Sequence, residues 1–473
     1  MELPRIIQGG MGVGVSGFEL ARASARAGAL GVVSGTALDA VLARRLQLGD
    51  ADGALRRSLA RFPFPSVAER VLERYWVAGG KAPDAPFRAT PIPSARPSRA
   101  AVELLVVANF VEVDLAREGH AGVIGVNYLE KIQLPTLPAL YGALLAGVGC
   151  VLMGAGIPRA IPGALDRLAR GETATLAFDV QGAPAGAEHA TRFDPREFVG
   201  GAAPKLARPA FLPIVSSATL AERFVRSATG RVDGFVVEAH TAGGHNAPPR
   251  GALRLTETGE PIYGTRDRAD LAAFRALGLP FWLAGSRGTP EGLAAALAEG
   301  AAGIQVGTAF ACCEESGLDP ELRRRVLAAL EAGELVVRTD PRASPTGFPF
   351  KVAELAGTLG DRSTRRERVC DLGYLRQACV DAEGRVTWRC PAEPEADFVR
   401  KGGALDDARE RLCICNGLFA TIGLGQRRAD GSVEPPLVTA SDELRSVLRF
   451  RREEGAGYRA ADVVAGLFGK PAT

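Results

Sequence analysis

The stretch that decides the fold covers residues 280–309 and reads PFWLAGSRGTPEGLAAALAEGAAGIQVGTA. It opens with an apolar run over 280–284, continues through an alanine- and leucine-rich run over 291–298 and ends in an apolar run over 303–306. Two short apolar runs joined by a helical run are typical of parallel strands with a crossover helix. Glycines follow both apolar runs, at 285, 288 and 307. The stretch therefore predicts a βαβ unit with a glycine turn after each strand.

The same alternation extends through the preceding 280 residues. The expected strands cover residues 5–8, 31–34, 122–127, 150–153, 211–216 and 234–238, followed by 280–284 and 303–306. Eight parallel strands with glycine turns after the last two favour a closed (β/α)₈ TIM barrel over an open sheet. We expect the barrel over residues 1–350, a proline-rich insertion at about 50–99, and a cysteine-containing C-terminal extension over 351–473.

The charge composition limits the kinds of binding partner that we expect. The 473 residues include 57 basic and 54 acidic side chains, so the net charge is only +3. Such a small charge argues against nucleic acid or a membrane surface as a partner. The N-terminal residues lack a basic segment followed by an apolar one, so we expect no secretory signal and a cytoplasmic location. The eight cysteines are then expected as reduced thiols or metal ligands rather than disulfides.

The two glycine turns predict a phosphate site. In a barrel, the turns after strands 7 and 8 are neighbours, and glycine lets backbone N–H groups approach a phosphate closely. Gly285, Ser286, Gly307 and Thr308 are the candidate binding residues, and Arg287 could add charge. The alternative is that these glycines only make tight turns. Their matching positions on two adjacent strands favour phosphate binding.

Histidine chemistry is concentrated in one loop. Two of the four histidines, His240 and His245, follow the sixth expected strand, which ends at Glu238. Histidine titrates near neutral pH, which suits proton transfer. Gly244 would let the backbone pass close to a planar ligand. We expect His245 to be catalytic; for His240 a structural hydrogen bond and a catalytic role stay equally open, and metal binding by the pair is not favoured.

Several motifs together resemble one known family. They are the N-terminal PRIIQGGM over residues 4–11, GVN over 125–127, AGGH over 242–245, AG over 284–285 and QVGTAF over 305–310. In this order they are similar to the nitronate monooxygenase (2-nitropropane dioxygenase-like) family, over about residues 1–350. The superfamily also includes flavin-dependent enoyl-acyl-carrier-protein reductases, some of them trans-acting synthase subunits.

The resemblance implies an FMN-dependent oxidoreductase. Gln8, Gly9, Gly10, Met11 and Asn127 would contact the isoalloxazine ring, and the glycine turns would hold the phosphate. His245 matches the family's catalytic histidine, which would orient a nitronate or take its α-proton. Ser286 with Arg287, the second imidazole of His240, the insertion and the long extension depart from the compact family members.

Three functions stay open at this stage. The first is oxidation of alkyl nitronates with oxygen, which the AGGH and QVGTAF motifs favour. The second is NAD(P)H-dependent reduction of enoyl thioesters, with a carrier protein as partner. The third is a flavin-holding scaffold without turnover. Oligomeric state is open as well.

Metal binding in the extension is a separate question. Its five cysteines, at 370, 379, 390, 413 and 415, do not follow a CxxC zinc pattern. We therefore expect buried or free thiols there and no metal.

Overall fold

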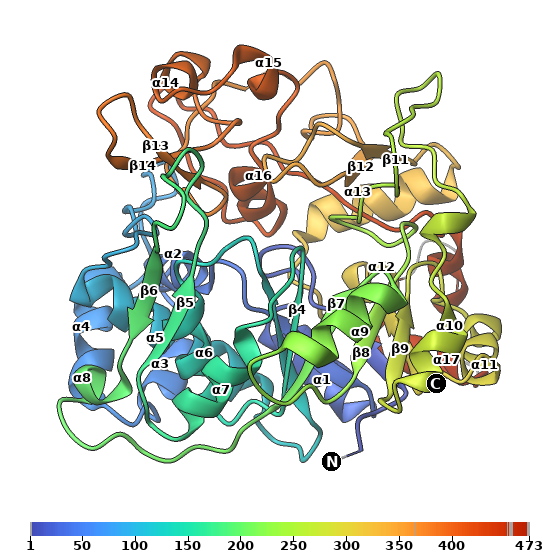
Figure 1. Cartoon of the computed structure of the whole chain (residues 1–473), viewed down its shortest axis with the longest axis horizontal. Helices are drawn as coiled ribbons and strands as arrows, with labels where there is room; N and C mark the ends of the chain where they lie inside the picture. Colours follow the sequence, from blue (N-terminus) through green and yellow to red (C-terminus); the bar gives the residue numbers. More distant parts are fainter. Residues whose placement is uncertain (1, 365, 452, 454–456, 471–473) are drawn as a thin grey trace.

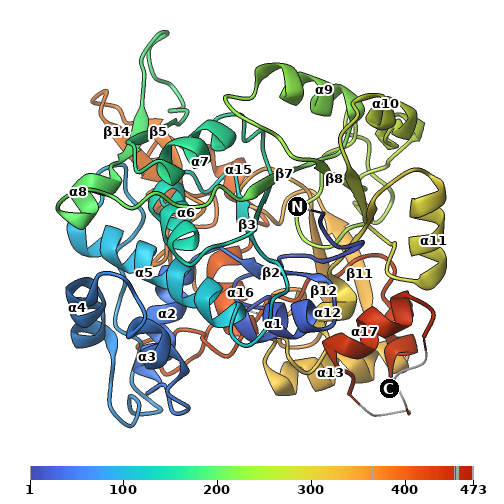
Figure 2. The same ribbon diagram turned by 90° about the horizontal axis from the view of Figure 1, so that it is seen from below.

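The computed structural model describes residues 2–364, 366–451, 453 and 457–470, and its central feature is a closed barrel of eight parallel strands (Figures 1 and 2). Around the barrel the strands follow the order β1-β10-β9-β8-β7-β4-β3-β2. The first and last barrel strands along the chain, β1 and β10, pair with one another, so that Ile6 lies beside Ile304 and Gln8 beside Val306. The predicted (β/α)₈ barrel is thereby confirmed. Its strands are β1 (Ile6–Gln8), β2 (Leu30–Ser34), β3 (Ile124–Leu129), β4 (Cys150–Gly154), β7 (Ala210–Val215), β8 (Phe235–Glu238), β9 (Phe281–Ala284) and β10 (Gly303–Val306).

Alternation along these strands divides the apolar side chains between two layers. Every second side chain, including those of Ile7, Val32 and Leu152, belongs to a small cluster formed by the strands themselves. The side chains between them, such as those of Ile6 and Val33, belong to a larger cluster that includes the surrounding helices. Successive side chains of a strand point to opposite faces, so these clusters are the barrel interior and the layer between barrel and helices.

A ring of helices covers the barrel. Several begin at a side chain that caps their first turn: Ser98 accepts a hydrogen bond from Ala101 N, and Ser217 accepts one from Leu220 N. The helices that follow the barrel strands are α1 (Phe18–Arg26), α2 (Leu38–Gln47), α5 (Arg99–Ala116), α6 (Thr136–Leu145), α7 (Ile161–Ala169), α9 (Ala218–Ser227), α10 (Leu271–Ala276), α11 (Pro290–Ala298) and the short α12 (Thr308–Ala311).

Additional elements interrupt this pattern. The predicted insertion at 50–99 contains two helices, and the segment between β4 and β7 contains a hairpin and one short helix. The proline-rich stretch is thus helical over its first half, and the later prolines form the extended return to α5. These elements are α3 (Ala54–Leu59), α4 (Pro65–Tyr75), β5 (Ala174–Ala177), β6 (Ala190–Phe193), α8 (Pro195–Val199) and, after β8, the 3₁₀ turn η1 (Thr265–Asp267).

The C-terminal residues lie over one end of the barrel, drawn above it in Figure 1, and then return along its side to α1. The predicted boundary at residue 350 falls on the first residue of β12, whose hairpin partner β11 precedes it. The elements after the barrel are α13 (Pro320–Glu331), β11 (Val336–Asp340), β12 (Phe350–Glu354), β13 (Gln377–Val380), β14 (Val386–Arg389), α14 (Glu395–Arg400), α15 (Leu405–Ala408), α16 (Ile414–Thr421), η2 (Arg445–Phe450) and α17 (Ala460–Leu467).

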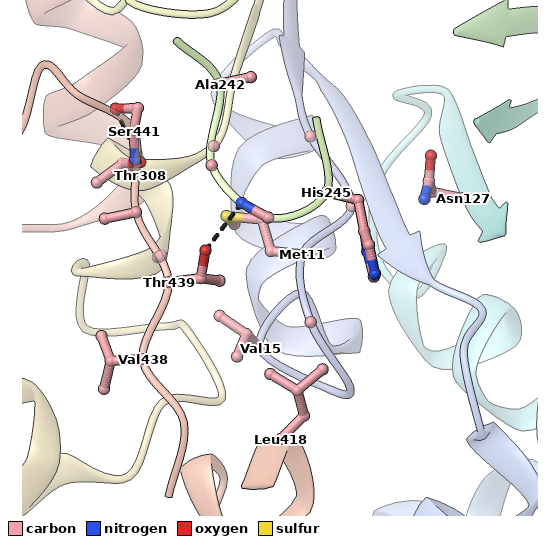
Figure 3. A pocket seen from close by; sticks show the side chains of 18 of the residues that line it. Met11, Val15, Asn127, Ala242, His245, Thr308, Leu418, Val438, Thr439 and Ser441 are labelled. Atoms are coloured by element: carbon pink, nitrogen blue, oxygen red, sulfur yellow. Dashed lines mark hydrogen bonds between the residues drawn. The ribbon is translucent and has the colours of Figure 1, made fainter. Parts of the chain in front are cut away.

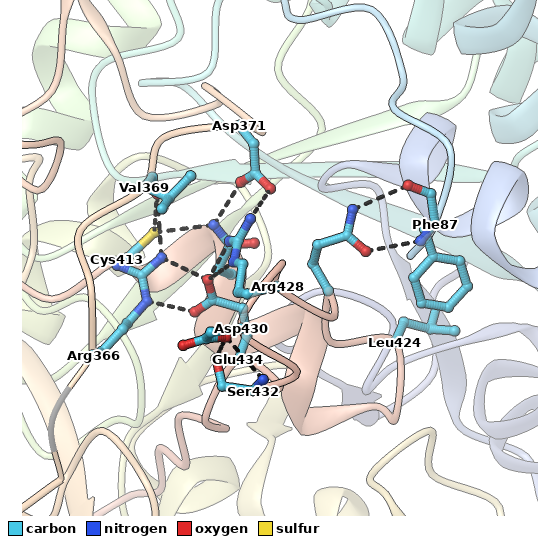
Figure 4. A network of polar contacts seen from close by, with 12 residues as sticks. Phe87, Arg366, Val369, Asp371, Cys413, Leu424, Arg428, Asp430, Ser432 and Glu434 are labelled. Carbon is cyan, nitrogen blue, oxygen red and sulfur yellow. Dashed lines mark hydrogen bonds and ion pairs between the residues drawn. The ribbon is translucent and has the colours of Figure 1, made fainter. Parts of the chain in front are cut away.

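A buried ion network holds this irregular extension together (Figure 4). Glu434 pairs with both Arg366 and Arg428. Arg428 Nη1 also lies 2.7 Å from Asp371 Oδ2, and Asn416 Nδ2 donates to Asp371 Oδ1 at 2.8 Å. Polar groups therefore link segments that have few regular backbone hydrogen bonds of their own. None of the helices in the described residues is long and apolar enough to cross a membrane.

Candidate active site

A cavity of about 260 Å³ opens at the carboxyl ends of the barrel strands (Figure 3). Turns after β1, β8, β9 and β10 form its floor and one wall. Helix α16 and residues 437–444 of the extension form the opposite wall. This end of a TIM barrel carries the active site in characterised enzymes, so the cavity is the candidate site.

The structure brings almost all of the predicted cofactor residues together at this cavity. They come from strand β3, from the turns after β1, β9 and β10, and from the loop after β8. Those that line the cavity are Gly9, Gly10, Met11, Asn127, Gly244, Gly285, Ser286, Gly307 and Thr308.

Gln8 is the exception, and its predicted contact with the cofactor is not supported. Its side chain is fully buried and does not line the cavity. Its Nε2 donates to Gly9 O at 2.6 Å and to Ser16 Oγ at 3.0 Å, and its Oε1 accepts from Val32 N at 3.0 Å. Gln8 therefore ties the turn after β1 to strand β2.

Glycine is required at two positions of the cavity wall. A Cβ atom on Gly10 would lie 2.4 Å from Asn127 Cβ. Gly285 has φ +97°, and a Cβ there would lie 2.8 Å from Thr241 Oγ1. The wall is thus built with exposed backbone where side chains cannot fit, which suits close approach of a ligand.

Two buried polar atoms in the wall lack a hydrogen-bond partner. Gln305 Oε1 and Thr36 Oγ1 belong to residues that line the cavity, and neither has a partner in the described chain. Buried polar atoms are normally satisfied, because leaving one unpaired costs about 1–3 kcal/mol. A bound ligand with N–H and O–H groups would satisfy both atoms, so these residues fit a polar cofactor.

The extension partly occupies the end of the cavity at which the sequence predicted phosphate binding. Thr308 Oγ1 donates to Ser441 Oγ at 3.1 Å and accepts from Ser441 N at 2.9 Å. Arg287 lines the cavity but pairs with Glu299 at 3.1 Å. The hydroxyl of Thr308 is therefore already engaged, and Ser441 is an additional hydroxyl that the sequence did not identify.

His245 lies on the cavity wall, held from one side by the extension. Its Nε2 is 2.7 Å from Ser344 Oγ, and its ring meets Phe350 edge-on at 4.8 Å between centroids. Burial lowers the pKa of His245 to about 4, because the charged imidazolium would lose hydration. The imidazole is therefore neutral at pH 7 and can accept or donate a proton at the nitrogen not bonded to Ser344.

The structure separates His240 from the cavity. Its ring stacks on Tyr263 with 4.0 Å between centroids and 10° between planes, and it does not line the cavity. His240 lies nearer to the end of β8 than His245 does. Of the two histidines that the sequence offered as catalytic candidates, only His245 lines the cavity.

Glu238 is a cavity residue that the sequence did not single out. It is the last residue of β8, and burial raises the pKa of its carboxyl to about 8. Within the described chain no group hydrogen-bonds this carboxyl, so nothing offsets its loss of hydration. The sequence could have indicated Glu238, because it is an acidic residue at the end of an apolar strand, and that end of a barrel strand lies at the active site.

The extension also fixes the loop that carries His245. Gly244 N donates to Thr439 Oγ1 at 2.8 Å, and Lys351 N donates to Gly244 O at 2.9 Å. Gly244 has φ +79°, a conformation that glycine adopts without strain. No motif marks Thr439 or Lys351, so this support could be found only in three dimensions.

The cysteines form no disulfide in the structure. All eight are free, and among the described residues no group of three or more His, Cys, Asp or Glu side chains is arranged to hold a metal ion. Cys370, Cys390, Cys413 and Cys415 nevertheless line one small cavity in the extension.

Comparison with known proteins gives a match to one family model over part of the chain. Residues 200–346 match the family model described as nitronate monooxygenase. The chain is 36% identical over 119 residues to a probable nitronate monooxygenase of Bacillus subtilis, covering 25% of this chain and 32% of that protein. It is 27% identical over 241 residues to (3aS,4S,5R,7aS)-5-hydroxy-7a-methyl-1-oxo-octahydro-1H-indene-4-carboxyl-CoA dehydrogenase of Mycobacterium tuberculosis, covering 50% of this chain and 60% of that protein.

The chain thus spans less than two thirds of the length of either curated relative. Among solved structures, FabK from Thermotoga maritima is similar with a TM-score of 0.48 and 14% identity, over 99% of this chain and 92% of that one. That similarity is too distant to bear on function. The family match covers the His245 loop and both predicted phosphate turns, so the similarity to nitronate monooxygenases lies in the part of the chain that forms this side of the cavity.

Proposed function

We propose that the chain is an FMN-dependent nitronate monooxygenase that oxidises alkyl nitronates with O₂. One observation carries the proposal: the glycine turns and His245 meet at a single cavity that also contains an uncharged carboxyl. The proposal concerns the activity of the whole chain, which extends well beyond the matched family segment.

The cavity offers suitable contacts for FMN. Its glycine wall would take the phosphate and ring edge, and the unpartnered Gln305 and Thr36 would bond to polar groups of the cofactor. Bound FMN would supply the electron chemistry, accepting electrons from the substrate and passing them to oxygen. The protein residues then have three tasks: to bind the substrate, to orient it and to keep unfavourable charge away from it.

His245 and Glu238 define the electrostatics of the substrate end. A nitronate is an anion, and a carboxylate beside it would repel it. Because the pKa of Glu238 is about 8, its carboxyl is uncharged and able to donate a hydrogen bond at pH 7. Neutral His245 can donate or accept a hydrogen bond at a substrate oxygen or take an α-proton from a nitroalkane. The pair therefore suits an anionic substrate at neutral pH.

Substitution of Gly10 by alanine is expected to weaken FMN binding by about ten- to a hundredfold. The added Cβ overlaps Asn127, so either the turn after β1 or Asn127 must move away from its cofactor-binding position. Quenching of FMN fluorescence on titration into apoprotein measures the affinity. Gly201→Ala is the matched control, since nothing lies within 4 Å of its Cβ. Equal FMN affinity in both variants would contradict this placement of the cofactor.

The pH dependence of kcat/KM for a nitronate should have a basic limb with a midpoint near 8. As pH rises through the pKa of Glu238, its carboxyl becomes negative and repels the anionic substrate. Glu238→Gln should remove this limb between pH 7 and 9.5, whereas exposed Glu257→Gln should retain it. Steady-state rates across this range test the prediction. A limb that persists unchanged in Glu238→Gln would assign the titration to another group.

Enoyl-thioester reduction is the second candidate, and one observation favours it. Leu418, Phe419 and Leu437 of the extension give the cavity an apolar wall, which could accommodate an acyl chain. The M. tuberculosis relative is likewise named for a substrate that is a CoA thioester. This activity would require NADH or NADPH as the electron donor.

Steady-state assays separate the two candidates. With propane 2-nitronate in air, we expect oxygen consumption and nitrite release without added nicotinamide. With an enoyl-CoA and NADPH, we expect no oxidation of NADPH above the rate of the flavin-oxygen background. The reverse pattern would replace the proposed function by the reductase.

A further inference from the structure

A second cavity lies in the extension and shares a wall with the main one. Cys370, Cys390, Cys413 and Cys415 all line it, although they come from three separate segments of the chain. Leu375, Ile414 and Cys415 line both cavities. Half of the cysteines in the chain therefore gather directly behind the candidate active site.

Two of these thiols influence one another. Cys370 and Cys390 line the same small cavity, and each side chain shifts the pKa of the other. Cys390 is buried directly after β14, while Cys370 is partly exposed. A disulfide between them would close across this cavity, with an S–S bond of about 2.05 Å.

Cys370 also opens onto a polar pocket that contains several charges. Arg368, Arg376 and Lys401 line this pocket, together with the acidic residues Glu367, Glu393 and Asp397. Lys401 pairs with Glu393 at 2.8 Å, and Arg368 lies 3.5 Å from Glu395. Arg376 instead donates to the backbone carbonyls of Pro93 and Gly373. Its positive charge is therefore available to a thiolate nearby.

The environment favours the thiolate of Cys370 over that of Cys390. The side chain of Cys390 lowers the pKa of Cys370 and, with Arg376, outweighs burial and the charges of Glu393 and Asp371. The side chain of Cys370 in turn raises the pKa of Cys390, and burial raises it further. A partly exposed thiolate beside a protonated, buried thiol is the arrangement found at oxidation-sensitive cysteines.

We propose that Cys370 is a modification site for hydrogen peroxide and that Cys390 resolves the oxidised product as a disulfide. The Cys370 thiolate attacks one peroxide oxygen, the O–O bond breaks, and hydroxide leaves as the sulfur becomes a sulfenic acid. The Cys390 thiol then attacks that sulfur, the S–O bond breaks, and water leaves as the disulfide forms. The two thiols are oxidised by two electrons and the peroxide is reduced by two. The site does not depend on the proposed function.

The test uses full-length, FMN-supplemented protein that has been reduced, freed of reductant and exposed to hydrogen peroxide. We expect the loss of two free thiols per chain, a mass decrease of two hydrogen atoms and a Cys370–Cys390 peptide in a tryptic map. In Cys390→Ser, Cys370 should instead accumulate as a sulfenic acid that dimedone labels. At pH 7 this sulfenic acid should form faster than that of an ordinary thiol, of which only a few per cent is ionised, by up to about thirtyfold.

Variants separate this pair from the other thiols. Cys379→Ser, which removes a buried thiol outside the small cavity, should form the disulfide as the wild type does. Two-thiol loss that persists in Cys370→Ser would overturn the proposal. So would a wild-type map in which Cys370 and Cys390 remain reduced, or stoichiometric zinc that protects the four cysteines. Because the map is made on wild-type protein, the proposal stays testable even if a variant fails to fold.

Discussion

Replacement of His245 by asparagine is expected to lower turnover by about a hundred- to ten-thousand-fold while FMN remains bound. Asparagine is too short to replace the contact of His245 Nε2 with Ser344, but the bonds of Gly244 to Thr439 and Lys351 remain, so the loop should keep its position. It cannot take up a proton, and it presents a different donor to the substrate. Steady-state turnover with a nitronate, alongside the absorbance ratio of bound flavin to protein, measures both expectations.

His240 supplies a matched control for this experiment because it lies five residues earlier in the same loop. Its ring stacks on Tyr263 outside the cavity, so His240→Asn should change turnover by no more than about twofold. Equal losses in the two variants would mean that loop structure, and not the imidazole of His245, limits the reaction.

The second large effect is expected in stability. Glu434→Ala should lower the free energy of unfolding by about 3–5 kcal/mol, because it leaves the largely buried guanidinium of Arg366 without this carboxylate and that of Arg428 with Asp371 alone (Figure 4). The side chain of Glu434 is only 2% exposed. Urea denaturation followed by tryptophan fluorescence measures the change.

The control is an ion pair at the surface of the same extension. Glu383 pairs with Arg385 at 3.0 Å, and its side chain is 62% exposed. Solvent screens such a pair, so Glu383→Ala should change the free energy of unfolding by less than about 1 kcal/mol. A similarly small change in Glu434→Ala would show that the network in Figure 4 does not stabilise the extension.

The barrel could be predicted from local sequence because each strand carries its own signal. Val236 and Leu283 lie in short apolar runs, and turn glycines such as Gly285 mark where the chain leaves the barrel. The eight predicted strand ranges all overlap observed strands. The helices α3 and α4 were less evident, because prolines around them suggested an irregular insertion.

Residues of the candidate site could be predicted only where they belong to a sequence motif. His245 and Gly307 belong to such motifs, and both line the cavity. Gln8 also lies in a motif, but its side chain is buried against β2, which the sequence alone does not reveal. Ser441 and Thr439 approach the site from more than a hundred residues beyond the barrel, so only the folded chain brings them there.

The central claim is that FMN in this cavity takes electrons from nitronates. Anaerobic mixing of the FMN-loaded protein with propane 2-nitronate, and separately with NADH and NADPH, tests it by following flavin absorbance. We predict rapid bleaching with the nitronate and slow or no bleaching with either nicotinamide. Bleaching by NADH or NADPH alone, with none by the nitronate, would contradict the account.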